Sequence, residues 1–223
     1  PMVPGSFDSS TSPRSSVPVV AAFDVDKTLT THDCVLPFLR RVGGVAFAAA
    51  LVRHTPPLAV AALRRERDRA KVLLTRAAVT GRPLADVDRI AHEFADHVWA
   101  RRMRPDTVAR LRWHARHGHR VVLVSASYRN YLDPLAERLG VETVLSTELE
   151  VVDGRCTGEL SGPNCRGAVK AARLSEWIRQ GRVESPVIYA YGDSSGDRDM
   201  LELSDHPVLV GSARIDESPE VVR

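Results

Sequence analysis

The sequence predicts an α/β fold: a doubly wound parallel sheet with an all-helical insertion after its first strand. Short apolar runs such as residues 18–24 and 120–125 indicate strands that are buried on both faces. These runs alternate with helical patterns, which is typical of a parallel sheet. Residues 35–115 are helical in pattern throughout. Such a stretch is too long for one crossover connection, so we interpret it as an inserted cap.

The composition supports a folded domain. The chain has 223 residues, of which 43% are hydrophobic and 26% charged, and this balance excludes wholesale disorder. A net charge of +3 is too small to indicate a nucleic-acid partner. Three widely spaced cysteines predict neither a disulfide framework nor a zinc site, so we expect a reducing, cytoplasmic location. No apolar run is long enough for an integral membrane segment, and nothing in the sequence indicates the oligomeric state.

The elements follow one another in an order that divides the chain. Residues 1–17 are rich in Ser and Pro and predict a flexible leader. Residues 18–33 and 109–223 are expected to form the core domain, and residues 34–108 the helical cap. Glycine and proline breaks predict cap helices at 35–42, 45–54, 58–80 and 84–102, followed by a helix at 106–117.

The second half predicts the rest of the sheet. We expect strands at 120–125, 141–145, 186–191 and 207–210, with helices at 130–139, 167–180 and 198–203. The dipeptide Asp153-Gly154 marks a tight hairpin between residues 148–152 and 156–160.

Polar side chains follow three of the predicted strands. Asp24 and Asp26 end the first, Ser125 the second and Asp193 the fourth, and Lys170 lies in the helix before the fourth. Ligands of open α/β sheets bind beyond the carboxyl ends of the strands. Carboxylates without His or Cys suit Mg²⁺, while Ser and Lys suit a phosphate group. Each residue alone also fits an ordinary polar position, so the prediction depends on their joint arrangement.

Four segments resemble the ordered motifs of the haloacid dehalogenase superfamily. They are FDVDKTLT (23–30), VLVSAS (122–127), Lys170 and YGDSSGDRDM (191–200). The helical insertion is similar to the cap of the phosphoserine-phosphatase-like branch, subfamily IB. The resemblance implies a Mg²⁺-dependent phosphomonoester hydrolase that works through an aspartyl-phosphate intermediate.

The resemblance also implies a role for each motif residue. Asp24 would be the nucleophile and Asp26 the general acid and base. Asp24, the backbone carbonyl of Asp26 and Asp193 would hold Mg²⁺, with Asp197 supporting them. The phosphoryl group would be contacted by Thr28, Ser125, the Ala126 N–H and Lys170.

Two cap residues are candidates for substrate specificity. Asp33 stands where phosphoserine phosphatases carry a glutamate, and it is equally suited to cap the helix that follows. Lys71 aligns near the position of a substrate-binding arginine in that family, or it lies on a solvated helix face.

The substrate is less defined than the chemistry. SAS at 125–127 and Gly196 depart from the phosphoserine phosphatase pattern. We expect a small phosphorylated metabolite, similar to phosphoserine or to histidinol phosphate. A lipid phosphatase of the phosphatidylglycerophosphate type is an alternative, because residues 43–63 are apolar, although packed helices share this composition. A binding protein that keeps the fold without catalysis is the other alternative. An arginine-rich segment, residues 101–120, is interpreted as a solvated helix pair, with Trp99, Trp113 and Trp177 as packing residues.

Overall fold

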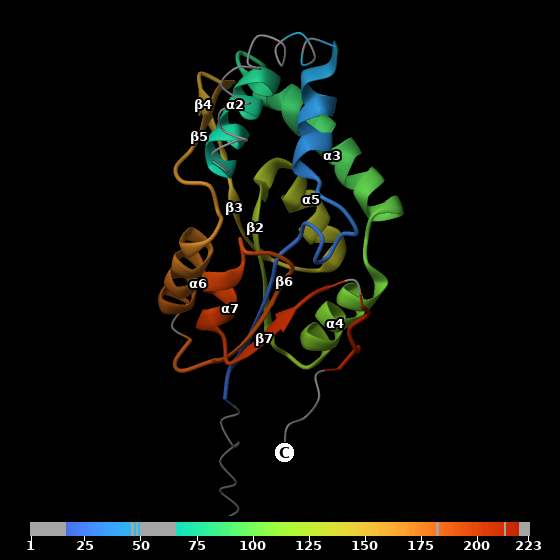
Figure 1. Ribbon diagram of the computed structural model, residues 1–223, viewed down its shortest axis with the longest axis vertical. Coiled ribbons are helices and arrows are strands. Elements are labelled where there is room, and N and C mark those ends of the chain that lie inside the picture. The colour runs from blue at the N-terminus through green and yellow to red at the C-terminus, as the bar shows by residue number, and fades with distance from the viewer. Residues whose placement is uncertain are drawn as a thin grey trace, which may run out of the picture.

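A computed structural model describes residues 17–45, 47, 49, 66–181, 183–211 and 213–218 (Figure 1). Nearly all of the predicted leader lies outside the described residues, as do most of the predicted helix 45–54 and the first part of the predicted helix 58–80.

The core is a five-stranded sheet in which every neighbouring pair is parallel. Its strands are β1 (Val19–Phe23), β2 (Arg120–Tyr128), β3 (Thr143–Thr147), β6 (Val187–Gly192) and β7 (His206–Leu209). The order β3-β2-β1-β6-β7 places β1 in the centre and confirms the predicted fold class. The residue that follows β1 therefore lies in the middle of the sheet's carboxyl edge.

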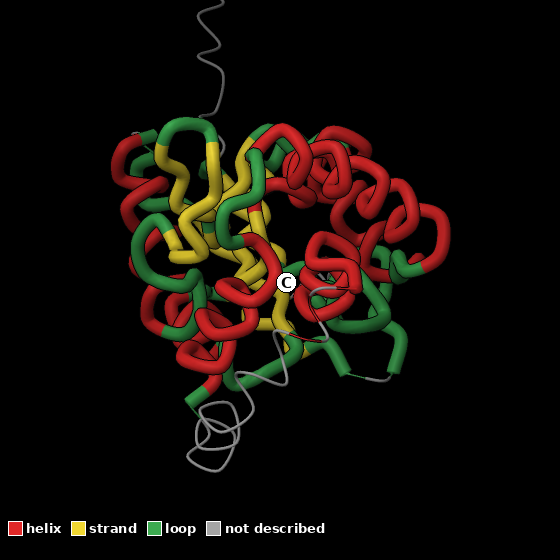
Figure 2. Tube along the Cα trace, turned by 90° about the horizontal axis from the view of Figure 1, so that it is seen from above, coloured by secondary structure: helices red, strands yellow, loops and turns green. Residues whose placement is uncertain are grey.

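Alternate residues of β1 enter two separate cores. Ala21 and Phe23 face one core, together with apolar side chains of α4 (Pro105–Arg116) and α5 (Arg129–Leu139). Val20 and Ala22 face the other, together with Leu174 of α6 (Ala168–Gln180) and residues near α7 (Arg198–Leu203). Figure 2 shows the strands between helices on both sides. Burial on both faces is the reason why β1 and the middle of β2 are apolar without alternation.

The helical insertion lies at one end of the sheet (Figure 1). Residues 35–45 are helical, and Gly44 adopts a φ of 57° at the predicted glycine break. After the undescribed stretch come α2 (Arg67–Val79) and α3 (Leu84–Arg101). The predicted hairpin is present as β4 (Leu149–Val152) and β5 (Arg155–Leu160), which pair antiparallel.

The hairpin contacts the insertion, although its residues fall in the predicted core range. The Gly81 N–H donates to the carbonyl of Cys156 at 2.8 Å, and the Arg76 guanidinium pairs with Glu159 at 2.5 Å. The dipeptide Asp153-Gly154 predicts the hairpin itself, but it does not predict that the hairpin packs against the helical insertion.

Two strands differ from the prediction by more than one residue at a boundary. β2 continues to Tyr128, because its pairing with β3 resumes after a register shift at Tyr128 and Thr147. The predicted strand 141–145 begins later, at Thr143, because Gly140 and Val141 close helix α5 with hydrogen bonds to Glu137 and Ala136.

The arginine-rich segment is only partly solvated. Arg110 is buried and donates to the Tyr191 hydroxyl and to the backbone carbonyls of residues 216–218. Arg104 pairs with Asp106 at 2.9 Å. The interpretation as a solvated pair is wrong for these two arginines, which hold the C-terminal segment against α4. Trp99 and Trp177 pack against the cores as predicted. None of the helices in the described ranges is long and apolar enough to cross a membrane.

Candidate active site

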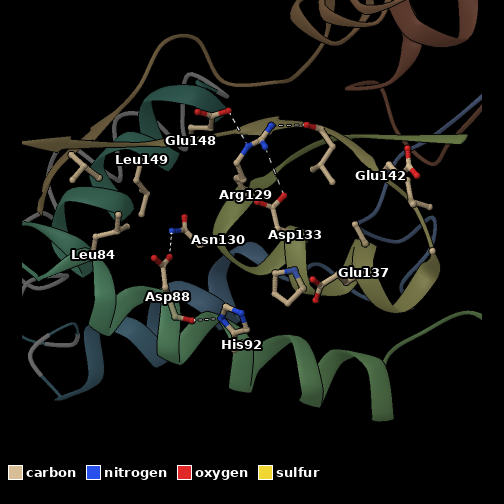
Figure 3. Close-up of a pocket in the computed structure, with 16 residues that line it drawn as sticks. Leu84, Asp88, His92, Arg129, Asn130, Asp133, Glu137, Glu142, Glu148 and Leu149 are labelled. Carbon is tan, nitrogen blue, oxygen red and sulfur yellow. Dashed lines mark hydrogen bonds and ion pairs between the residues drawn. The ribbon is translucent and has the colours of Figure 1, made fainter.

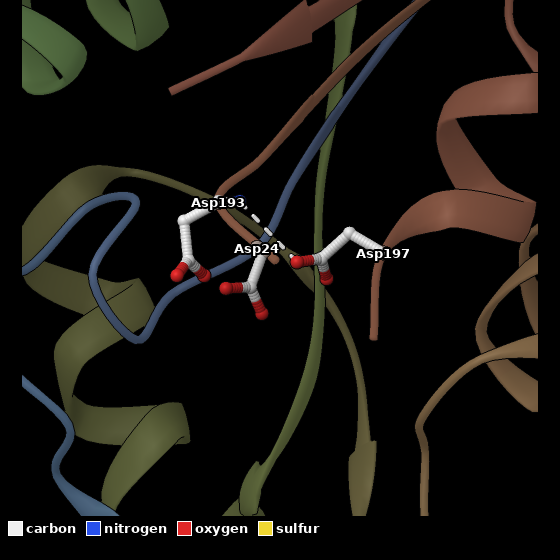
Figure 4. A group of neighbouring side chains, drawn as sticks. All are labelled: Asp24, Asp193 and Asp197. Atoms are coloured by element: carbon white, nitrogen blue, oxygen red, sulfur yellow. Dashed lines mark hydrogen bonds between the residues drawn. The ribbon is translucent and has the colours of Figure 1, made fainter. Parts of the chain in front are cut away.

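Three carboxylates meet at the carboxyl edge of the sheet. Asp24 follows β1 directly, Asp193 follows the neighbouring strand β6, and Asp197 precedes α7. One oxygen of each lies within 4.8 Å of the others (Figure 4). The Asp24 N–H donates to the carbonyl of Tyr191 at 2.9 Å, so the β1–β6 pairing extends to the first of these residues. The predicted convergence of Asp24 and Asp193 is thus present.

A buried lysine neutralises part of this charge. The Lys170 ammonium donates to Asp24 Oδ1 at 2.5 Å and also to Asp197 Oδ1. Burial alone would lower the pKa of Lys170, but the two carboxylates keep it raised. Burial also disfavours the charged form of Asp24 and raises its pKa to about 6, although the Lys170 charge opposes this increase. The ammonium therefore stabilises Asp24 as an anion.

The other oxygen of Asp197 shapes the loop after β6. Asp197 Oδ2 accepts hydrogen bonds from the backbone N–H groups of Asp193 and Ser194, at 3.2 and 3.0 Å, and from the Ser194 hydroxyl at 3.0 Å. A Cβ at Gly192 would lie 2.5 Å from the Cβ of Asp197, so a glycine is required there. Asp197 thus uses both of its oxygens within the protein, whereas the Lys170 ammonium contacts only one oxygen of Asp24.

Asp26 has different partners from Asp24. Its Oδ1 accepts from the Cys34 N–H at 3.1 Å and its Oδ2 from the Ser127 hydroxyl at 2.6 Å. Burial raises the pKa of Asp26 to about 7, and the negative charges of Asp33 and Asp24 add to the increase. Two carboxylates that are two residues apart thus have different electrostatic surroundings: one contacts an ammonium, and the other contacts only neutral donors.

A cavity of about 340 Å³ opens onto these residues. Its walls include most of the predicted site: Asp24, Asp26, Ser125, Ala126, Lys170, Asp193 and Asp197. Thr28 is not among its lining residues. Its side chain is fully buried, and its hydroxyl has no hydrogen-bond partner within the described ranges.

Both candidate specificity residues line the same cavity. Asp33 Oδ1 accepts hydrogen bonds from the N–H groups of Val35 and Leu36, at 3.0 and 3.4 Å, so it also caps the helix that follows. Lys71 is 8% exposed, which overturns the reading of a solvated helix face. Its ammonium donates to the Ala126 carbonyl and to Asn164 Oδ1, the latter at 2.7 Å. Burial lowers the pKa of Lys71 to about 7.

The sequence reasoning missed several residues of the site. Ser127 is the second serine of the SAS segment, and its position two residues after Ser125 was the only indication of a role. Arg67, Asn164 and Arg166 also line the cavity. They lie in the cap or in the loop before α6, where no strand end marks a site.

A larger cavity, of about 890 Å³, lies elsewhere, between α3, α5 and the β3–β4 region (Figure 3). Within it, the Asn130 amide donates to Asp88 Oδ1 at 2.6 Å, and Arg129 pairs with Glu148 at 3.0 Å. None of the motif residues lines it. The chemistry of the side chains therefore assigns the active site to the smaller cavity.

The fold and this site define a protein of the parallel α/β class with its acidic centre at the end of the central strand. The sequence profile of haloacid dehalogenase-like hydrolases matches residues 21–202. The chain belongs to this family, as the four motifs predicted.

Relatives agree with this assignment. The chain is 35% identical over 190 residues to the protein CicA of Caulobacter vibrioides, with 84% of each chain covered. It is 33% identical over 180 residues to the phosphoserine phosphatase SerB2 of Mycobacterium tuberculosis, covering 80% of this chain and 41% of that one. The solved structure of phosphoserine phosphatase in its apo form superposes with a TM-score of 0.60 at 16% identity, covering 84% of this chain and 83% of that one, which shows a shared fold. The chain is a phosphatase.

Proposed function

We propose that this phosphatase hydrolyses a small phosphorylated metabolite with Mg²⁺ as cofactor. The reaction has two displacements at phosphorus, in which Asp24 is first the nucleophile and then the leaving group. The observation that carries the proposal is the pair Asp24 and Asp26, which share one cavity but contact different partners. Two carboxylates in different surroundings are suited to two different roles.

Asp24 is the proposed nucleophile. Its Oδ2 is not used by the Lys170 contact, which is made to Oδ1. This oxygen forms a bond to phosphorus while the ester P–O bond breaks, giving an aspartyl phosphate and, with a proton from Asp26, the free alcohol. Lys170, together with Ser125 and the Ala126 N–H, would bind the phosphoryl oxygens, and the lysine charge reduces the repulsion between two anions. Thr28 is fully buried and does not line the cavity, so in this mechanism it supports the first motif and does not contact the phosphoryl group.

Asp26 is the proposed general acid and base. In the first step its proton goes to the leaving oxygen. In the second step it takes a proton from a water molecule, the water oxygen bonds to phosphorus and the Asp24–phosphorus bond breaks. The Ser127 hydroxyl and the Cys34 N–H fix the orientation of the carboxyl group for both transfers.

The donor set of the site fits Mg²⁺. Asp24 and Asp193 supply hard carboxylate oxygens within 4.8 Å of each other, and the backbone carbonyl of Asp26 would be the third protein ligand. Bound there, Mg²⁺ would neutralise charge on the phosphoryl oxygens during the transfer. Asp197 would hold Asp193 in place through the 3.2 Å bond from the Asp193 N–H.

The proposed substrate is phosphoserine-like or histidinol-phosphate-like. The relative SerB2 is named a phosphoserine phosphatase, and the cavity of about 340 Å³ is of a size for a small metabolite. The lipid alternative depends on residues 43–63, most of which lie outside the described part of the chain. All three cysteines are unpaired and buried, which fits a reducing cytoplasm as the place of action.

Phosphate release from a panel of phosphomonoesters tests the proposal, with Mg²⁺ present or chelated. We expect release that depends on Mg²⁺ and that Asp24→Asn abolishes, because an amide cannot form the acyl phosphate. Asp86→Asn is the matched control. Asp86 and Asp88 are separated by one residue, as Asp24 and Asp26 are, but Asp86 is exposed on α3. Substantial Mg²⁺-dependent turnover by Asp24→Asn would disprove the mechanism.

A further inference from the structure

Arg166 lies across the backbone of Gly196 in the loop that carries the acidic centre. A Cβ at Gly196 would lie 3.0 Å from Arg166 Nε and 3.3 Å from its Cγ, so the missing side chain provides the space for the guanidinium arm. The backbone joins the same two loops, since the Gly167 N–H donates to the Gly196 carbonyl at 2.8 Å. Gly196 thus has a local explanation: it makes room for an arginine.

Arg166 is held at the cavity without a partner for its charge. It is half-buried and lines the cavity that contains Asp24 and Lys170. Within the described ranges, its guanidinium forms no ion pair or side-chain hydrogen bond. The loop geometry fixes its base, because its N–H donates to the Asn164 carbonyl at 2.7 Å.

Four other cations line this cavity: Lys27 and Arg67 are exposed, and the two buried ones are already engaged. Lys170 pairs with Asp24 and Asp197, and Lys71 donates to Ala126 and Asn164. The nearby Asp68 carboxylate accepts from the Asn164 amide at 2.6 Å. An unpaired, partly buried guanidinium therefore remains to meet a ligand. Its planar fork matches a carboxylate or a phosphate.

We propose that Arg166 binds a second anionic group on the alcohol part of the substrate. This inference rests on the proposed phosphatase function and narrows its substrate class to phosphomonoesters whose alcohol carries a carboxylate or a further phosphate. Arg166 would be a specificity-determining residue of the core, separate from the cap residues Asp33 and Lys71. Gly196 would be its positioning partner.

The experiment compares kcat/KM for three esters: glycerol 3-phosphate, 3-phosphoglycerate and 1,3-propanediol bisphosphate. We expect the wild type to favour one or both of the esters that carry a second anionic group. Comparing 3-phosphoglycerate with 1,3-propanediol bisphosphate shows whether a carboxylate or a phosphate is preferred. Arg166→Gln should reduce the preference at least tenfold, mainly through KM, and Arg166→Lys should retain part of it. Arg112→Gln, which removes an exposed arginine of α4, controls for the loss of one positive charge.

Gly196→Ala tests the geometry without removing the charge. Its methyl group should displace the guanidinium and reduce the preference, whereas in the Arg166→Gln background it should add nothing. An unchanged preference in Arg166→Gln would overturn the inference while leaving the phosphatase function intact. An equal loss of kcat for all three esters would also overturn it, because Arg166 would then act on the transferred phosphoryl group. No Mg²⁺-dependent release from any ester would overturn the proposed function itself and the inference that rests on it.

Discussion

At the scale of single residues, the site separates two chemically identical side chains by their neighbours. Asp24 contacts the Lys170 ammonium, whereas Asp26 contacts the Ser127 hydroxyl and the Cys34 N–H. A charged donor favours the ionised form much more than neutral donors do. The division of roles in the proposed mechanism therefore depends on side chains from α6 and β2, elements far from the D-x-D segment in sequence.

Ser127 is expected to act as a positioning residue for Asp26. Ser127→Ala should lower kcat about tenfold to hundredfold with little change in KM, since a well-placed acid–base group contributes about 10²–10⁴-fold. Steady-state kinetics on the preferred ester measure this split. Ser146→Ala is the matched control, because the Ser146 hydroxyl is buried without a hydrogen-bond partner in the described ranges. Equal kcat values for wild type and Ser127→Ala would refute the role.

At the scale of elements, the Asn164 amide is one of the groups that join α2 to the core, beside the direct contacts of Lys71 with Ala126 and of Thr75 with Tyr128. Asn164 accepts from Lys71 of α2 and from Thr147 of β3, at 2.7 and 2.8 Å, and donates to Asp68 of α2 at 2.6 Å. This amide thus connects a helix of the insertion to the sheet beside the proposed phosphate-binding segment, residues 125–126.

Replacing Asn164 should loosen that connection. Asn164→Ala leaves the buried Lys71 ammonium with fewer acceptors, so we expect the free energy of unfolding to fall by about 1–3 kcal/mol. Urea denaturation measures the change. Asn130→Ala, which removes a single bond to Asp88, should cost less. The same loss in both variants would argue against a special role for Asn164.

Helix α4 packs a neutral histidine against the sheet. His114 Nε2 lies 2.8 Å from the Tyr191 hydroxyl and its Nδ1 2.7 Å from His119. Burial, together with the nearby His119, Arg110 and His117, lowers the pKa of His114 to about 3. Among the described residues, the ring contacts aromatic side chains and these basic groups, and no anion there favours its protonation.

Stability should therefore decrease in mild acid. The folded-state pKa of His114 lies below the unfolded value of 6.5, so its contribution is complete above pH 6.5 and is lost as pH falls toward 3. One such group costs up to about 1.4 kcal/mol per pH unit in that window. Denaturation between pH 7 and 5 should show a smaller loss for His114→Gln than for the wild type or for the exposed control His92→Gln. Parallel losses in all three would contradict this assignment.

At the scale of the whole molecule, the cluster of carboxylates should couple metal binding to global stability. A ligand that binds only the folded state at ten times its Kd stabilises it by about 1.4 kcal/mol, or about 3–5 °C in Tm for a chain of this size. We expect Mg²⁺ to raise Tm in the wild type but not in Asp193→Asn, with KCl at equal ionic strength as the control. A shift that persists in Asp193→Asn would place the metal elsewhere.

The order of the elements and the chemistry of the motifs could be predicted from the amino-acid pattern. Continuous apolar runs such as 120–125 predict strands buried on both faces, and strand ends converge at one edge of a parallel sheet whatever the loops do. Asp24, Ser125, Lys170 and Asp193 could be brought together on that basis alone. These inferences use the periodicity of neighbouring residues, which is local, and the convergence of strand ends, which holds for any parallel sheet.

The side-chain contacts between elements could not be predicted in this way, because they depend on the three-dimensional packing. Four such features involve residues that lie 3 to 101 positions apart in the sequence. They are the hydrogen bond from Ser127 to Asp26, the hydrogen bonds accepted by both oxygens of Asp197, the burial of Lys71 and the contact of Arg166 with Gly196. Side-chain contacts of this kind depend on the packing of helices against the sheet and on loop conformation. No periodic pattern in the sequence encodes them, because the free energy that fixes them comes from neighbours supplied by other elements.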